Sequence, residues 1–145
     1  ILAQGRGTGN RRQLAERFAA HPDSVLLGTN SFWEGLDLPG QALSCVVIVR
    51  LPFRPPDDPI MRARGERLQD PFLELALPEA VLRLKQGFGR LIRRARDRGA
   101  VVILDGRVTS KTYGAHFLES LPECASWTGP AAGLAGAVTG WVEGR

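Results

Sequence analysis

Cysteine is scarce in this sequence, and long apolar runs are absent from it. Cys45 and Cys124 are the only two cysteines and form no Cys-x-x-Cys pair, so we expect no zinc or iron–sulfur site held by this chain. No apolar run reaches the roughly 20 residues that a helix needs to cross a bilayer, and no charged-then-apolar leader opens the chain. These absences predict a cytoplasmic protein with no membrane partner.

Lysine is also scarce, because Lys85 and Lys111 are the only lysines among 19 basic residues. The formal net charge is +4 at pH 7, which favours an anionic partner. Five arginines crowd one short stretch: Arg90, Arg93, Arg94, Arg96 and Arg98. Arginine is a forked donor well suited to phosphate oxygens. A solvated helix end, where cations interact favourably with the helix dipole, is the alternative explanation, and charge alone does not decide between them.

Strand-length apolar runs alternate with helical patterns along the chain. The predicted strands are residues 24–29, 44–50 and 100–104, and the predicted helices are residues 10–20, 58–69, 78–94 and 109–121. This alternation predicts an α/β fold with a mainly parallel sheet whose strands are buried on both faces. The opening residues 1–4 resemble the end of a strand, which suggests an N-terminally truncated domain. We expect one domain over residues 1–122 and a tail of weak signal over residues 123–145.

Two glycine-rich stretches resemble nucleotide-binding loops only in part. Residues 5–10 follow a predicted strand, but the dinucleotide fingerprint requires glycine where Asn10 stands. A dehydrogenase site there is therefore a weak alternative to a simple loop. Residues 106–112 end in Lys-Thr but lack the second glycine and the spacing of a P-loop. No stretch of the sequence satisfies the P-loop pattern, and no Asp-Glu pair closes an apolar strand to hold magnesium.

The predicted helix over residues 78–94 has two different faces. Its apolar face is formed by Val81, Leu84, Phe88, Leu91 and Ile92. Gln86, Arg90 and Arg93 lie on the opposite face, bordered by Gly87 and Gly89. Each glycine costs a helix interior about 1 kcal/mol relative to alanine. Two glycines within one turn therefore suggest that another group approaches the backbone closely, whereas an ordinary amphipathic helix would gain nothing from them.

The segment from Gln86 to Arg93 (QGFGRLIR) resembles motif VI of superfamily 2 helicases, whose core is Gln-x-x-Gly-Arg-x-x-Arg. Upstream, residues 28–40 (GTNSFWEGLDLPG) resemble motif V, in a form typical of the DinG group of XPD-like helicases. Further DinG-type segments lie at residues 51–59, 105–107 and 111–114, so the resemblance covers most of residues 1–122. Gly106 stands where the family would have proline, a departure that we expect to affect only the turn.

The resemblance implies a second RecA-like lobe of an ATP-dependent 5′–3′ DNA helicase. In these motors the first lobe carries the P-loop, the Mg²⁺ ligands and, in XPD-like members, an iron–sulfur module, and none of these is in this sequence. The implied cofactor is ATP with Mg²⁺, and the implied partners are single-stranded DNA and the first lobe of a parent protein that we expect to be monomeric. We expect this chain alone not to hydrolyse ATP.

The resemblance also assigns site residues in three groups. Arg90 and Arg93 match arginine fingers that reach the γ-phosphate; Gln86, Gly35 and Asp37 match positions that sense the nucleotide or couple it to the finger helix; Thr29, Ser31 and Trp33 match positions near the DNA strand.

Simpler roles stay open for several of these residues. Asp37 fits a turn before Pro39, and Trp33 fits a core position as well as a DNA contact. Arg54 lies among prolines outside these groups; it could contact nucleic acid or be solvated, and we favour a solvated side chain. For the whole chain, the main alternative is a non-catalytic nucleic-acid-binding module of the same fold.

Overall fold

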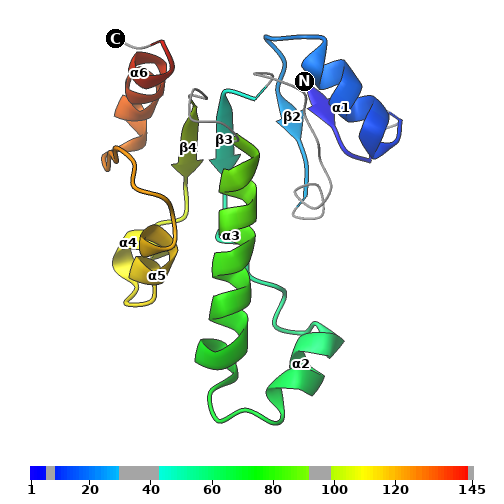
Figure 1. Cartoon of the computed structure of the whole chain (residues 1–145), viewed down its shortest axis with the longest axis vertical. Helices are drawn as coiled ribbons and strands as arrows, with labels where there is room; N and C mark the ends of the chain where they lie inside the picture. Colours follow the sequence, from blue (N-terminus) through cyan, green and yellow to red (C-terminus); the bar gives the residue numbers. More distant parts are fainter. Residues whose placement is uncertain (6–8, 30–42, 92–98, 144–145) are drawn as a thin grey trace. The chain divides into compact units, whose positions relative to one another are not determined.

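The computed structural model describes residues 1–5, 9–29, 43–91 and 99–143 (Figure 1). The chain divides into two compact units. Ile1–Val46, Gly87–Val101 and Trp127–Arg145 form the first unit, and Val47–Gln86 and Val102–Ser126 form the second.

The N-terminal part of the first unit is a small β-α-β arrangement. Strand β1 (Leu2–Ala3) pairs in parallel with β2 (Leu26–Leu27), and helix α1 (Arg11–Ala19) connects them. The side chain of Asn10 accepts a hydrogen bond from the Gln13 backbone N–H at 3.0 Å, and the Gln13 side chain accepts one from the Asn10 N–H at 2.9 Å. This reciprocal capping box confirms the predicted start of the helix.

A compact apolar core joins α1 to this strand pair. Its buried members are Leu2, Leu14, Ala15 and Phe18, with Leu26 and Leu43 packed against them. The face of α1 that carries Leu14, Ala15 and Phe18 is therefore the face that packs on the strand pair.

Strands β3 (Cys45–Ile48) and β4 (Ala100–Ile103) form a second two-stranded sheet. The Ala100 N–H donates to Ser44 O at 3.0 Å and the Leu104 N–H donates to Ile48 O at 2.9 Å. Because these bonds advance in the same direction along both segments, the strands are parallel, as their arrows show in Figure 1.

The strands are shorter than predicted, and the expectation that they are buried on both faces is wrong for part of them. Leu27 and Val47 are more than half exposed. Among the described residues, each of the two sheets has only two strands. The predicted α/β class is confirmed, with small parallel sheets.

Helix α2 (Pro59–Gly65) is capped by Asp58 and ends earlier than the predicted residue 69. A short π-helix, η2 (Phe72–Ala76), runs directly into α3 (Leu77–Leu91), which matches the predicted motif VI helix as far as the described residues extend. The Asp58 carboxylate accepts from the Ile60 and Met61 N–H groups at 2.9 and 3.1 Å, so the start of α2 is fixed locally.

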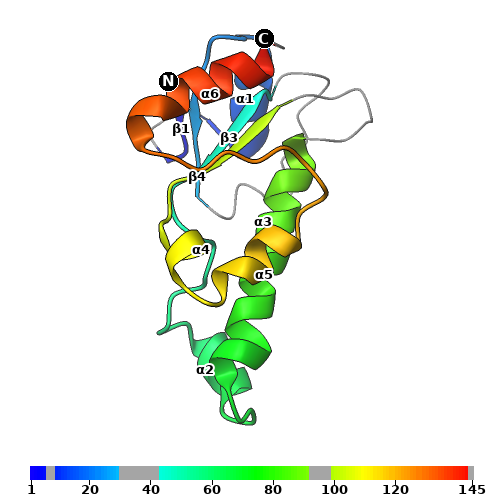
Figure 2. The same ribbon diagram turned by 90° about the vertical axis from the view of Figure 1, so that its left-hand side faces the viewer.

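The predicted single helix over residues 109–121 is wrong. The structure has two short helices there, α4 (Arg107–Ser110) and α5 (Gly114–Glu119), which lie side by side in Figure 2. The chain breaks between them because Lys111 adopts an extended conformation, with φ −110° and ψ 144°.

The tail of weak sequence signal contains a helix, α6 (Ala131–Val142). The Trp141 indole N–H donates to Gly99 O at 3.2 Å, which ties this helix to the residue before β4. Within the described part of the chain, every helix is too short or too polar to span a bilayer.

Candidate nucleotide and DNA site

Helix α3 carries the motif VI residues on a firmly packed scaffold. Leu77, Ala80, Leu84 and Leu91 are buried, while Val81 and Phe88 are half-buried, so the predicted apolar face is broadly confirmed. Gln86 is exposed and Arg90 is half-buried. These two residues lie four positions apart, about one turn, on the same side of the helix.

The two glycines of motif VI differ in their surroundings. Gly87 is buried, whereas Gly89 is exposed. Among the described residues, no heavy atom lies within 4 Å of where a Gly89 Cβ would stand. Packing within the described part of this chain therefore does not require glycine at position 89.

Most of the other predicted site residues lie outside the described part of the chain. These are Arg93 of motif VI and Ser31, Trp33, Gly35 and Asp37 of motif V. Thr29 is described and exposed. Its backbone N–H and its hydroxyl both donate to Gln4 Oε1, at 3.2 and 3.1 Å. Gln4, which follows β1, thus fixes the entry to motif V, a role that no sequence signal indicated.

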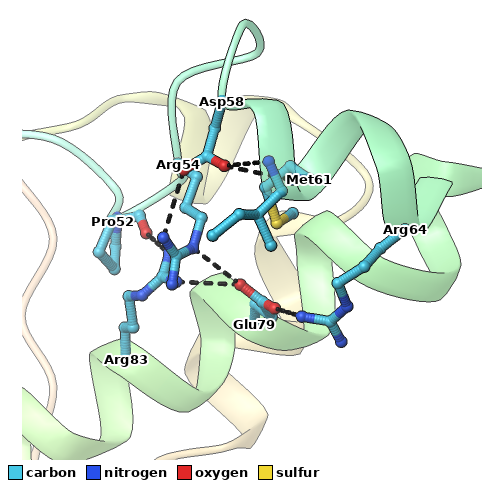
Figure 3. Close-up of polar contacts among 8 residues, drawn as sticks. Pro52, Arg54, Asp58, Met61, Arg64, Glu79 and Arg83 are labelled. Atoms are coloured by element: carbon cyan, nitrogen blue, oxygen red, sulfur yellow. Dashed lines mark hydrogen bonds and ion pairs between the residues drawn. The ribbon is translucent and has the colours of Figure 1, made fainter.

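A cluster of arginines around Glu79, near the start of α3, was not predicted (Figure 3). The Glu79 carboxylate accepts from Arg64 Nη1 at 2.6 Å, from Arg83 Nη2 at 2.9 Å and from Arg54 Nε at 3.2 Å. Arg54 Nη1 also lies 3.3 Å from Asp58 Oδ2. The expectation that Arg54 is merely solvated is therefore wrong, because it pairs with two carboxylates.

The electrostatics of Glu79 follow from this cluster. Partial burial raises the pKa of Glu79, but the hydrogen bonds from Arg54 and Arg64 and the charge of Arg83 lower it by more, so the pKa lies below its ordinary value. Arg83 Nη1 also donates to Pro52 O at 3.3 Å. The cluster thereby fixes the first turns of α3 to α2 and to the loop after β3.

A second polar assembly joins the segments that follow β3 and β4. Asp105 Oδ2 accepts from the Leu51 N–H at 2.8 Å and from Arg107 Nη2 at 2.6 Å. The Arg107 guanidinium also lies 5.5 Å from the ring centre of Phe53. The hydrogen bonds from Arg107, opposed by desolvation and reinforced by the Leu51 N–H, hold the pKa of Asp105 well below its usual range.

Gly106 begins the turn into α4 with φ −60° and ψ −14°. Proline adopts the same φ, so glycine in place of the family's proline leaves the course of the turn compatible with either residue. Among the described residues, no three His, Cys, Asp or Glu side chains come together in a way that could hold a metal ion.

Comparison with known proteins identifies the family of this chain. The model of the helicase C-terminal domain matches residues 1–124. The chain belongs to this family. The matched region ends before α6. Similarity to known DinG and YoaA helicases confirms the resemblance to DinG-type helicases that motifs V and VI indicated.

Three relatives illustrate the similarity. The chain is 52% identical to the ATP-dependent DNA helicase YoaA of Haemophilus influenzae, over 84% of this chain and 19% of the relative. It is 48% identical to the 3′-5′ exonuclease DinG of Bacillus subtilis, over 84% of this chain and 14% of the relative. It is 43% identical to the ATP-dependent helicase DinG of Mycobacterium tuberculosis, over 84% of this chain and 19% of the relative. The chain thus spans less than a fifth of the length of these relatives.

Proposed function

We propose that this chain is the second RecA-like motor lobe of an ATP-dependent DNA helicase. Its work requires a first lobe that binds ATP and Mg²⁺. Family membership and the similarity to DinG and YoaA helicases support this function. The observation that carries it is the motif VI sequence on α3, where Gln86 and Arg90 lie one turn apart on the helix.

In this proposal, Arg90 and Arg93 are the catalytic groups of the lobe. Phosphoryl transfer leaves negative charge on the oxygens of the transferred group, and a fixed guanidinium stabilises that charge by about 10³–10⁵ in rate. The buried side of α3 and the arginine cluster at Glu79 keep the helix in place, which limits reorganisation during the reaction. Gln86 would contact the nucleotide next to the two arginines.

Motif V supplies the link to DNA in the same proposal. Thr29, Ser31 and Trp33 would contact single-stranded DNA, while Gly35 and Asp37 would couple nucleotide binding to the finger helix. Translocation would run 5′ to 3′ in a monomeric parent protein. A non-catalytic DNA-binding module is the second candidate. The net charge of +4 and the arginine-rich stretch support binding to an anionic partner such as DNA, with or without catalysis.

Substitution of the two arginines in the full-length parent protein tests the proposal. Arg90→Ala and Arg93→Ala should each lower the DNA-stimulated kcat for ATP by about 10²-fold or more, because the guanidinium acts mainly as charge develops. Nucleotide binding should weaken far less. Lysine at either position should restore little activity, since an ammonium cannot reproduce the planar fork. Steady-state ATPase assays and nucleotide titrations measure these effects.

Lys85→Ala is the matched control, because Lys85 is an exposed cation on the same helix and lies outside the motif. It should leave kcat within about twofold. If Arg90→Ala and Arg93→Ala retained near-normal turnover, the catalytic assignment would be wrong and the DNA-binding module would be favoured. If both variants lost their circular dichroism signal, the arginines would be structural.

A further inference from the structure

Several large apolar side chains of α2 and η2 are exposed. Ile60 is 63% exposed and Leu73 is 53% exposed, and Phe72 is also partly exposed. Exposed apolar side chains that border a groove can mark an interaction site, and Ile60 lines such a groove. The proposed motor function uses none of these residues.

A groove runs between α2 and η2. It has a volume of about 690 Å³ and an apolar lining that is formed by Pro59, Ile60, Ala63, Leu68 and Leu75. Leu75 is buried and provides the floor. The volume falls within the range of about 300–1,000 Å³ that is typical of ligand pockets. The groove is therefore large enough for one apolar side chain and its neighbouring backbone.

Local contacts hold the two sides of the groove at a fixed spacing. A Cβ on Gly65 would lie 3.1 Å from Pro71 Cβ, so the end of α2 is packed tightly against the start of η2. Asp70 Oδ1 accepts from the Phe72 and Leu73 N–H groups, both at 3.0 Å. Because the groove is formed before any ligand arrives, a ligand pays little ordering entropy on the protein side.

The charges at the rim define the kind of ligand. Arg64, Arg67 and Glu74 line the groove. Glu74 Oε1 already accepts from the Asp70 N–H at 2.7 Å. Arg64 is held by Glu79 yet remains 57% exposed, and Arg67 is exposed. The rim therefore presents two arginines and one glutamate beside an aliphatic lining, an excess of one positive charge.

We propose that the α2–η2 groove docks a short acidic segment of a partner protein. The segment would insert one apolar side chain between α2 and η2, and its carboxylates would pair with Arg64 and Arg67. Nucleic acid fits less well, because single-stranded bases favour aromatic stacking platforms and this lining is aliphatic. The proposal is independent of the assignment of Arg90 and Arg93.

Peptide binding to the full-length protein that contains this chain tests the proposal. The probe is a fluorescein-labelled eight-residue peptide with one central leucine flanked by glutamates, followed by fluorescence anisotropy. It should bind saturably, and Arg67→Glu and Ile60→Asp should each weaken binding by about tenfold or more. Arg62→Glu is the matched control, because Arg62 is an exposed residue of α2 that does not line the groove, and it undergoes the same change of charge as Arg67. It should change binding by less than about twofold.

Further arms make the result decisive. A peptide with serine in place of leucine should bind at least about fivefold more weakly, and DNA-stimulated ATPase activity should be unchanged in Arg67→Glu. Equal losses in Arg62→Glu and Arg67→Glu would reduce the effect to general charge attraction and overturn the proposal. Competition by oligothymidylate at the same site would assign the groove to nucleic acid. Binding to the 145-residue chain but not to the full-length protein would show that the rest of the parent covers the groove.

Discussion

Asp105 joins distant parts of the chain through a single carboxylate. It accepts from the Leu51 backbone N–H and from both the backbone and the guanidinium of Arg107. Its side chain is only 9% exposed. Loss of the negative charge would leave the Arg107 guanidinium without its ionic partner. It would also weaken the buried acceptor for the Leu51 N–H.

Asp105→Asn should therefore lower the free energy of unfolding by about 1–3 kcal/mol at pH 7. Urea denaturation followed by circular dichroism measures this change. Glu16→Gln is the control, because Glu16 pairs with Arg12 at 2.9 Å on a well exposed helix surface, where such pairs contribute about 0–1 kcal/mol. Equal destabilisation by the two substitutions would contradict the structural role of Asp105.

The same carboxylate predicts a dependence on pH. Because its pKa is lowered in the folded state, its contribution to stability is complete above the ordinary pKa of aspartate, about 3.9. The contribution is lost as the pH falls through the folded-state value. The stability difference between the native chain and Asp105→Asn should therefore shrink below about pH 4. A difference that stays constant down to pH 2 would show that the Asp105 charge does not matter.

Sequence reasoning at this scale succeeded where partners are close along the chain. The predicted helix over residues 10–20 begins at Asn10, and the structure confirms this start because the capping partner, Gln13, is only three residues away. The role of Arg54 was missed because Glu79 is 25 residues away, and that of Asp105 because Leu51 is 54 residues away. No local pattern specifies such long-range pairs.

The pair of short helices α4 and α5 depends on a glycine. A Cβ on Gly114 would clash with the backbone carbonyl of Val108 and would lie 2.9 Å from Arg107 O. Backbone atoms cannot rotate away as a side chain can. Close approach at Gly114 therefore permits the chain to fold back between α4 and α5, which explains why the continuous helix predicted over residues 109–121 does not form.

Gly114→Ala should destabilise the fold by about 1–3 kcal/mol through overpacking. Thermal and urea unfolding measure the change. Gly106→Ala is a matched control, because among the described residues nothing lies within 4 Å of a Cβ at that position and its φ is −60°. It should be neutral or slightly stabilising, since alanine restricts the unfolded chain. Comparable losses in both variants would refute the packing argument.

At the level of elements, helices with a clear polar and apolar face were predicted well and the others were not. Helix α3 follows its periodic apolar positions from Leu77 onward. Helix α6 was missed because its Gly/Ala-rich sequence has no such contrast. The strands were predicted too long, since the apolar pattern extends beyond the few residues that pair in each two-stranded sheet.

For the molecule as a whole, family and site were predictable to different degrees. Motif VI is short and contiguous, so its residues can be recognised from the sequence alone. The described part of α3 carries Gln86 and Arg90 at the positions of that motif. The α2–η2 groove was not predictable, because it depends on the close packing of Gly65 against Pro71 and on which side chains then face one another.

Charge gives the whole chain a measurable property. The net charge is +4, and five arginines lie within residues 90–98. Single-stranded DNA should bind the chain with an affinity that falls with salt, by about 0.7 in log K per unit of log salt for each phosphate contact. Three to five contacts give a slope between about −2 and −3.5. The affinity should then fall by roughly 20- to 100-fold between 50 and 200 mM salt, as measured with labelled oligothymidylate.

The location of these contacts is tested by removing arginines that the proposal does not assign to ATP. A triple change of Arg94, Arg96 and Arg98 to alanine should reduce the slope by about 2, because each lost phosphate contact removes about 0.7. Removal of Arg12 and Arg17, which lie on α1, should leave the slope nearly unchanged. A slope near zero in the native chain, or equal changes in both variants, would show that the arginine-rich stretch is a solvated helix end and that DNA contacts lie elsewhere.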